Sequence, residues 1–374
     1  HYEVERCCKI GSGFRHLKSR QLSGRSNAPR SFWDTSGRYS FGCPKVFASL
    51  YFSEQDNEEG AVPCSEAQRR FYEEISKPED EINLIHASLY IAQDDLRLSD
   101  EDVVETSEEI SRIVANFEKR KPTVDYPMRI IKAVNKYLYA ELGFDGASEW
   151  RDSRNVYLPY VVRRRLGYSV SLGLIYREIC NTHGFPVEFV GMPGHFMLRA
   201  LGRGEPADSE MDLYIDPYRQ GEVLLRLEME HRLGSMLQSS KRVELEPKFA
   251  EAETKRRTLY RMLRSLKRIY LHRAQLESAL SVVDKLNLLD PTNPFEKRDR
   301  GILLYYFGKF ESARHDLEMY WALKTSAPDN LLLRELFREI KRVGVQGGRH
   351  RSHARTLSQT LLGLLKHEDE PQQL

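Results

Sequence analysis

Apolar side chains between Gly167 and Gly221 recur first with a helical period and then in short runs of strand length. Gly184, with Pro186 beyond it, predicts the end of the helix. Three apolar runs then predict strands separated by Gly and Pro turns, at 187–190, 195–200 and 213–215. The pattern therefore indicates one buried helix beside a small sheet, and the inner face of that helix carries Leu172, Ile175, Tyr176 and Ile179.

Three or four packed helices are predicted before this stretch, beginning near Cys64. Ser65 and Ser99 are N-cap candidates at the starts of two of them. Further apolar positions with a helical period lie between Met128 and Leu142. His86 stands among apolar neighbours, so we expect a hydrogen-bonded core residue there rather than a metal ligand.

A repeat pattern is visible in the C-terminal third of the chain. The intervals of a first tetratricopeptide unit are matched by Leu266, Tyr270, Ala279 and Pro291. A second unit is marked by Gly301, Gly308 and Ala313, the last of which lies 34 residues after Ala279. Pro328 comes three residues later than the period predicts, and a trailing helix is expected at 330–341. So short an array is expected to lean on the preceding domain.

The segment from Arg256 to Arg273 is rich in Arg and Lys but follows a helical, amphipathic pattern. We expect a solvated helix face there rather than an RNA site. The repeats themselves have two open interpretations: they present a face to a protein partner, or they buttress the core.

Composition narrows the function classes. The 374 residues allow two or three domains, and 57 basic against 55 acidic side chains give no net charge that favours nucleic acid or a membrane. No apolar run approaches the length of a membrane span. The five cysteines show neither a disulfide framework nor a metal-ligand spacing, and the scattered histidines form no zinc pattern. We therefore expect a reducing compartment, no metal and no cofactor.

Both ends of the chain differ from its middle. No acidic residue stands between Arg6 and Trp33, where Arg, Lys and Ser alternate. Such segments are typical of organelle transit peptides, so a plastid or other organelle is expected. The alternatives are a disordered basic arm on a cytoplasmic protein and, with no support beyond charge, a nucleic-acid contact. From Gly347 a flexible basic tail is expected, with a short helix through Leu361 to Leu365.

Three residues stand in the order that a papain-like site requires. Ser169 lies at the predicted helix start, His195 begins a predicted strand, and Asp216 ends another. In such a site a nucleophile at a helix N-terminus faces a histidine base, which a third side chain orients. These are the candidate catalytic residues. The ordinary alternative is that His195 and Asp216 bond to each other and only join two strands.

Five ordered segments resemble a known family: ELGFDG at 141–146, DSRNVYL at 152–158, VVRRRLGYSVSLGLIY at 161–176, GFPVEFVGMPGHFMLR at 184–199 and YIDPY at 214–218. Together with the repeats they resemble the SirB-type branch of the transglutaminase-like superfamily. The likeness covers roughly residues 63–340. It implies a helical lead-in, a papain- or transglutaminase-like core with a small antiparallel sheet, and C-terminal helical repeats. Many members of this branch have no assigned reaction.

The resemblance places a cysteine of catalytic members where this chain has Ser169. A thiol ionises near neutral pH because its free pKa is about 8.5. A helix dipole contributes on the order of 1 kcal/mol and cannot ionise an alcohol, which needs a general base and an oxyanion hole. A degenerate, non-catalytic site is therefore expected. The alternative is a hydrolase or acyl transferase with Ser169 as nucleophile, His195 as base and Asp216 as orienter.

The same helix carries two further residues that could stand in for the nucleophile. Cys180 shares a face with Ser169 but lies about 16 Å further along the axis, so we expect a small core residue. Ser171 belongs to the first helical turn, where hydroxyl groups commonly cap.

The segment before the helix has two interpretations. Asp152, Arg154 and Asn155 could orient the helix start or line a cleft above it. The alternative is that they simply form a turn, and we favour this structural role. Adjacent arginines point in different directions on a helix, so no phosphate clamp is expected from Arg163, Arg164 and Arg165.

We therefore predict an α+β protein in four parts: a basic segment at 1–62, a transglutaminase-like domain at 63–246, repeats at 247–342 and a tail at 343–374. The predicted function is that of a non-catalytic protein-binding or assembly factor. Its expected partner is another protein held by the repeats and the cleft, and neither nucleic acid nor a membrane.

Overall fold

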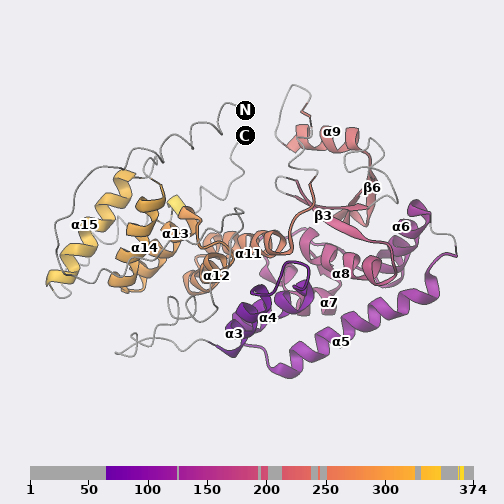
Figure 1. Cartoon of the computed structure of the whole chain (residues 1–374), viewed down its shortest axis with the longest axis horizontal. Coiled ribbons are helices and arrows are strands. Elements are labelled where there is room, and N and C mark those ends of the chain that lie inside the picture. Colours follow the sequence, from indigo (N-terminus) through magenta and orange to yellow (C-terminus); the bar gives the residue numbers. More distant parts are fainter. Residues whose placement is uncertain are drawn as a thin grey trace, which may run out of the picture. The chain divides into compact units, whose positions relative to one another are not determined.

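The computed structural model describes residues 65–123, 126–192, 195–200, 213–236, 243–244, 251–324, 330–346, 361 and 363–365. The basic segment 1–62, for which a transit peptide or a disordered arm was predicted, lies outside the described residues. Within the described part, helices and one four-stranded antiparallel sheet confirm the α+β expectation. The colours of Figure 1 follow the sequence and show that the strands of the sheet come after the helical lead-in and before the repeats.

The lead-in consists of α3 (Glu66–Ile75), α4 (Leu84–Leu96), α5 (Asp100–Asn116), the 3-10 helix η2 (Phe117–Arg120), α6 (Pro127–Asn135) and the π-helix η3 (Lys136–Glu141). Ser65 and Ser99 cap α3 and α5, each within a reciprocal capping box, as expected. His86 is exposed, so the core expectation is wrong. It shares the outer face of α4 with Tyr90, one turn away, while the other face carries the buried apolar residues.

The core begins with β1 (Asp145–Gly146), η4 (Ser153–Asn155), α7 (Leu158–Arg164) and β2 (Leu166–Gly167), followed by the long helix α8 (Ser169–Thr182). β1 and β2 form a short parallel pair. The main sheet follows with β3 (Val187–Met192), β4 (His195–Ala200), β5 (Leu213–Asp216), the turn η5 (Pro217–Arg219), β6 (Glu222–Leu224) and the helix α9 (Arg226–Met236).

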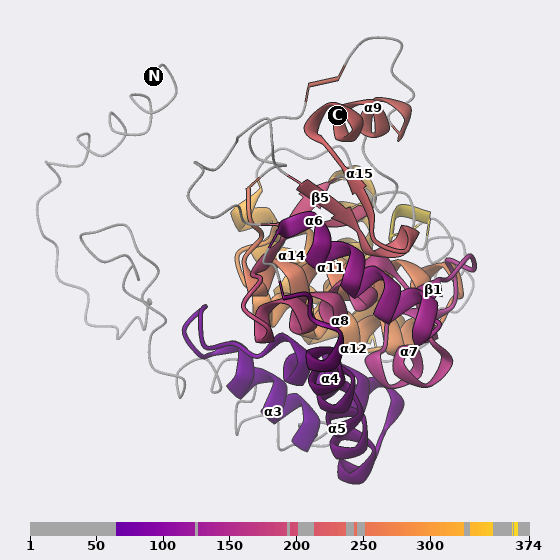
Figure 2. The ribbon, with the colours of Figure 1, turned by 90° about the vertical axis from the view of Figure 1, so that its right-hand side faces the viewer.

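The strand order of the main sheet is β3-β4-β5-β6, antiparallel throughout. Strand β6 was not predicted, because its three residues are too few to show a period of two. α8 packs on this sheet, and nine of its 14 residues are buried. Gly173 permits the close approach, since a Cβ there would lie 2.7 Å from the Phe189 ring. Figure 2 shows α8 and β5 from the side.

The repeats are two helical hairpins and a trailing helix: α11 (Lys255–His272), α12 (Leu276–Leu289), α13 (Pro294–Tyr306), α14 (Phe310–Leu323) and α15 (Asn330–Gln346). Ala279 and Ala313 are fully buried where paired helices meet, which confirms the repeat pattern. α15 runs five residues past the expected 341, and Pro328 lies outside the described residues. No described helix has both the length and the apolar composition needed to cross a membrane.

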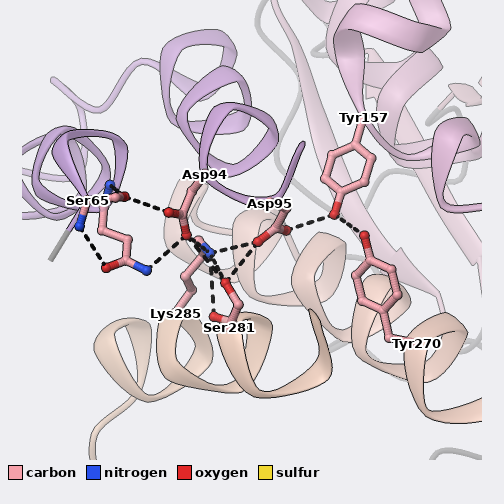
Figure 3. A network of polar contacts seen from close by, with 8 residues as sticks. Ser65, Asp94, Asp95, Tyr157, Tyr270, Ser281 and Lys285 are labelled. Carbon is pink, nitrogen blue, oxygen red and sulfur yellow. Dashed lines mark hydrogen bonds and ion pairs between the residues drawn. The ribbon is translucent and has the colours of Figure 1, made fainter. Parts of the chain in front are cut away.

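The repeats and the lead-in share a buried polar network (Figure 3). Nζ of Lys285 lies 2.5 Å from Asp94 and 2.9 Å from Asp95. Asp95 also accepts the hydroxyl of Tyr157 at 2.8 Å, and Tyr157 shares a 2.5 Å hydrogen bond with Tyr270. The repeats therefore pack against the preceding domain, as expected, and the contact contains buried ion pairs.

Helix α11 differs from the solvated basic face that its sequence predicted. Lys267 is buried and pairs with Glu296 at 2.8 Å. Arg256 donates to the carbonyls of Ile75 and Lys77 in the lead-in. The expectation is wrong for these residues because their partners come from distant segments of the chain, which a helical wheel does not contain.

Candidate functional site

Ser169 is the first residue of α8, and the chain before α7 fixes its backbone. The N–H of Tyr168, the residue preceding the helix, donates to the carbonyl of Asn155 at 2.8 Å. Ser171 is buried, and its hydroxyl donates to the carbonyl of Val156 at 2.6 Å. The expected capping role of Ser171 is therefore wrong, because its hydroxyl donates its hydrogen bond to a carbonyl of the neighbouring segment.

The turn before α7 has the structural role that we favoured. Asp152 accepts hydrogen bonds from the backbone N–H and Nε of Arg154. Asn155 accepts from Arg164 at 3.0 Å and donates to the carbonyl of Glu149 at 2.9 Å. The same turn also orients the helix start, through the Asn155 carbonyl. Arg164 thus serves the turn, whereas Arg163 is exposed and Arg165 lies 3.2 Å from Glu109, so the three arginines diverge.

His195 and Asp216 are brought together by the pairing of β4 with β5. Nε2 of His195 lies 2.8 Å from Oδ1 of Asp216. A carboxylate only accepts, so the imidazole carries its proton on Nε2 in this contact. The His195 side chain is 20% exposed, whereas Asp216 is fully buried. The Tyr218 ring packs edge-on against the imidazole at 5.9 Å and limits its rotation.

Every oxygen of the Asp216 carboxylate is engaged. Oδ1 also accepts the backbone N–H groups of Tyr218 at 3.0 Å and Arg219 at 3.3 Å, which begin the turn η5. Oδ2 accepts from Nη1 of Arg232 at 2.7 Å. The buried negative charge is therefore held by two backbone donors, an imidazole and a guanidinium.

Arg232 comes from α9 and was not among the predicted site residues. Its Nη2 lies 2.8 Å from Glu222, which stands directly opposite Asp216 across β5 and β6. Two carboxylates opposite each other on a sheet repel, and the guanidinium between them removes that repulsion. In the sequence Arg232 is one more charge in a polar helix, and nothing in its spacing marks this role.

Ser169 and His195 lie beside each other without a hydrogen bond between their side chains in the described structure. Oγ of Ser169 instead accepts the backbone N–H of Phe196 at 3.4 Å. With Nε2 of His195 committed to Asp216, only Nδ1 is left to receive a proton from this hydroxyl. The three predicted residues thus converge in a papain-like order, with a long contact at the position of the nucleophile.

Cys180 lies in the core, as expected. Its side chain is fully buried, and burial raises the pKa of its thiol well above the ordinary value. It therefore does not replace the missing nucleophile. The described residues contain no group of three or more His, Cys, Asp or Glu side chains placed to hold a metal ion.

A groove of about 450 Å³ lies beside α9. Its lining includes Arg232 but neither Ser169 nor His195, and it consists of Arg219, Leu224, Leu227, Glu228, His231, Arg232 and Ser235. Among the described residues, the groove is therefore lined by two partners of Asp216, Arg219 and Arg232, and by none of the three candidate catalytic residues.

Comparisons with known proteins agree with this architecture. The family model of the transglutaminase-like superfamily matches residues 105–264, and a tetratricopeptide repeat model matches 266–338. A UPF0162 protein of Xylella fastidiosa (strain 9a5c) is 32% identical over 206 residues, which are 54% of this chain and 70% of the relative.

Two more distant proteins also align. F-box only protein 21 of Homo sapiens is 27% identical over 183 residues, which are 43% of this chain and 29% of that protein. A crystal structure of menin aligns over 81% of each chain with 10% identity and a TM-score of 0.34, and no conclusion rests on it. On the extent of the Xylella match, and with both family models in the expected order, the chain belongs to the UPF0162 family of transglutaminase-like proteins with C-terminal tetratricopeptide repeats.

Proposed function

We propose that this protein is a non-catalytic binding or assembly factor. In this proposal the transglutaminase-like core is a scaffold, and the tetratricopeptide repeats hold another protein. The observation that carries the proposal is the pairing of Asp216 with Arg232 at 2.7 Å, beside a serine in the place of the nucleophile.

The Arg232 pair matters because of what the acid does in an active site. During acyl transfer the base becomes an imidazolium, and the carboxylate behind it stabilises that cation. Here Oδ2 of Asp216 already pairs with a permanent guanidinium, so the imidazole is not the only cationic partner this carboxylate could have. The pair of His195 with Asp216 then serves mainly to join β4, β5 and η5.

Ser169 supports the same proposal. An alcohol needs a base that takes its proton during attack, since its own ionisation is out of reach near neutral pH. The hydroxyl accepts a backbone N–H of Phe196 and has no hydrogen bond to His195 in the described structure. Such an arrangement favours a hydroxyl that supports the hairpin over one that attacks a carbonyl.

The repeats supply the binding half of the proposal. Tetratricopeptide repeats generally mediate contacts between proteins, and here two helical pairs with a trailing helix follow the core. The alternative function is a hydrolase or acyl transferase that uses Ser169, His195 and Asp216, and the converging geometry of these residues favours it as the second candidate.

Labelling with a fluorophosphonate probe separates the two functions. We expect the purified protein to show no more labelling by the probe than its Ser169→Ala variant. Labelling of the intact chain that disappears in Ser169→Ala and in His195→Gln would establish an activated serine and overturn the non-catalytic proposal.

Cross-linking after affinity purification tests the binding half. We expect the protein and Ser169→Ala to retain the same partner in equal yield, with cross-links from that partner to exposed lysines of the repeats such as Lys309 and Lys341. Cross-links confined to the core would mean that the repeats only buttress it.

A further inference from the structure

Arg261, on the first helix of the repeat array, holds the end of the hairpin that carries His195. Met192 and His195 pair with each other at the end of β3 and the start of β4. Nη2 of Arg261 donates to the carbonyl of Met192 at 2.7 Å and to that of His195 at 3.1 Å. One guanidinium therefore fixes the backbone of both strands where β3 ends and β4 begins, next to the candidate base.

The Arg261 side chain is withdrawn from water, being 18% exposed. Burial lowers its pKa below the usual range, and the charge of Glu253, 2.6 Å from Nη1, opposes that effect. The guanidinium also stacks on the Phe196 ring, with 4.1 Å to the ring centroid. A buried cation with an acid, a ring and two carbonyls as partners holds one orientation.

The segment that supplies Glu253 is itself attached to the sheet. Ala252 forms an isolated antiparallel bridge with Val190, and the N–H of Glu253 donates to the carbonyl of Phe189 at 2.7 Å. The chain entering α11 thus extends the edge of β3. The ion pair of Glu253 and Arg261 is anchored at both of its ends.

Gly191 provides the space for this ion pair. A Cβ at Gly191 would lie 1.9 Å from the Glu253 carboxylate and 2.5 Å from Nη1 of Arg261. No side chain fits there without displacing one of the two partners. The hairpin therefore also contributes to its contact with α11, through the absence of a side chain at Gly191.

The same contact reaches the other candidate residue. Phe196, on whose ring Arg261 lies, donates its backbone N–H to Oγ of Ser169. In addition, the two matched family models end and begin at 264 and 266, inside α11. This helix belongs structurally to both the repeats and the site.

We infer that Arg261 is a positioning residue for His195, and that the geometry of the His195–Asp216 pair depends on the docking of α11 against the hairpin. The inference holds whether Ser169 is reactive or inert, so it does not rest on the proposed function. A protein bound to the repeats that displaces α11 would alter the site through this residue.

Arg256 provides a matched control on the same helix. It donates to two carbonyls, of Ile75 at 2.9 Å and Lys77 at 2.6 Å, and pairs with Glu79 at 2.6 Å. Its chemistry is that of Arg261, but its contacts lie in the lead-in. Arg261→Met and Arg256→Met, made in the full chain, remove equivalent interactions in two places.

Hydrogen exchange and NMR distinguish a positioning role from general stabilisation. In Arg261→Met we expect amide exchange in residues 187–200 to rise about tenfold or more. We also expect loss of the imidazole N–H resonance of His195, assigned by its absence in His195→Gln. Arg256→Met should leave both signals unchanged and raise exchange around residues 75–83 instead. Unchanged hairpin signals in Arg261→Met, or equal changes in both variants, would overturn the inference.

A milder variant keeps the test decisive if Arg261→Met does not fold. Glu253→Gln retains the size of the side chain but removes the charge that holds the guanidinium. We expect a smaller rise in exchange in the same hairpin, with the His195 resonance broadened. Arg261→Lys should restore part of the protection, because an ammonium can still donate to both carbonyls. A positioning role would be contradicted if the hairpin amides of Glu253→Gln exchanged at the wild-type rate and those of Arg261→Lys showed no retained protection.

Discussion

Arg232 and Asp216 form an ion pair across the carboxylate from His195, with 2.7 Å between Nη1 and Oδ2. The acid therefore lies between an imidazole on one oxygen and a guanidinium on the other. This relationship links α9 to the end of β5 and makes the helix part of the candidate site. It also gives the pair of His195 with Asp216 a structural function that needs no reaction.

Removing the Arg232 charge should destabilise the fold. Arg232→Met leaves the buried Asp216 with its hydrogen bonds and the exposed Arg219, 4.0 Å away, but without its close counter-ion. We expect a loss of about 2–4 kcal/mol in the free energy of unfolding. Glu222→Gln removes the partly exposed partner of the same guanidinium and should cost less than about 1 kcal/mol. Urea unfolding at neutral pH measures both, and equal losses would contradict the buried-pair account.

Two helical glycines should respond to alanine with opposite signs. Gly173→Ala places a methyl group 2.7 Å from the Phe189 ring. It should cost about 1–3 kcal/mol through overpacking, which outweighs the gain in helix propensity. Among the described residues, a Cβ at Gly234 would meet only Val243, at 3.7 Å. Gly234→Ala should therefore stabilise α9 by about 0.5–1 kcal/mol. Thermal unfolding of both variants checks the difference, and a stabilised Gly173→Ala would mean that helix and sheet are less tightly packed.

The network around Lys285 should contribute to acid stability. Burial alone would raise the pKa of Asp94, but the charge and hydrogen bonds of Lys285, with hydrogen bonds from Ser65 and Gln68, outweigh it and lower the pKa. A lowered folded-state pKa stabilises the protein above the unfolded value of about 3.9, and this contribution disappears as the pH falls through the folded value. Asp94→Asn should therefore lower stability at pH 7 and flatten its decline below about pH 4.

Asp100→Asn is the control for the Asp94 experiment. The pKa of Asp100 is also lowered, first by a hydrogen bond from Arg70, but its side chain is 62% exposed. Solvent screening should make its contribution small. If both variants changed the pH dependence of urea unfolding equally, the buried position of Asp94 would not be the cause.

Lys285 itself should be costly to remove alone. Lys285→Met leaves two adjacent buried acids without their cation, and we expect a loss of about 3–5 kcal/mol. The triple variant Asp94→Asn, Asp95→Asn, Lys285→Met removes all three charges and should recover at least half of that loss. If the triple variant were as unstable as Lys285→Met, the attraction within the ion pairs would itself stabilise the junction, and the cost of Lys285→Met would not come from the uncompensated acids.

The local environment of the site is testable with a thiol. Ser169→Cys places a thiol at the N-terminus of α8 beside His195, where a thiolate is favoured. We expect it to react with iodoacetamide in the native protein at least about tenfold faster than Cys180, whose pKa is raised by burial. Mass spectrometry of the two peptides gives the rates. Similar rates would place residue 169 outside the influence of the helix and the histidine.

Local patterns along the chain sufficed for its elements. A period of 3.6 in the apolar residues predicted α8, and short apolar runs bounded by Gly and Pro predicted β3, β4 and β5. The spacing of Ala279 and Ala313 predicted the repeats. These features follow from the need to bury one face of each element, which is written into the order of residues. The convergence of Ser169, His195 and Asp216 came from the family resemblance together with the positions of these residues at element ends.

The tertiary structure decided which charges take part in the site and the junction. Arg232 and Arg261 stand in polar helical stretches and Lys285 in a mostly apolar one, and for each charge a solvated position is the ordinary expectation. Lys285 is buried, and Arg232 and Arg261 are each only 18% exposed, because carboxylates and carbonyls from other segments surround them, up to 191 residues away in the case of Lys285 and Asp94. A charge leaves water only where such partners compensate it, and that compensation exists only once the chain has folded.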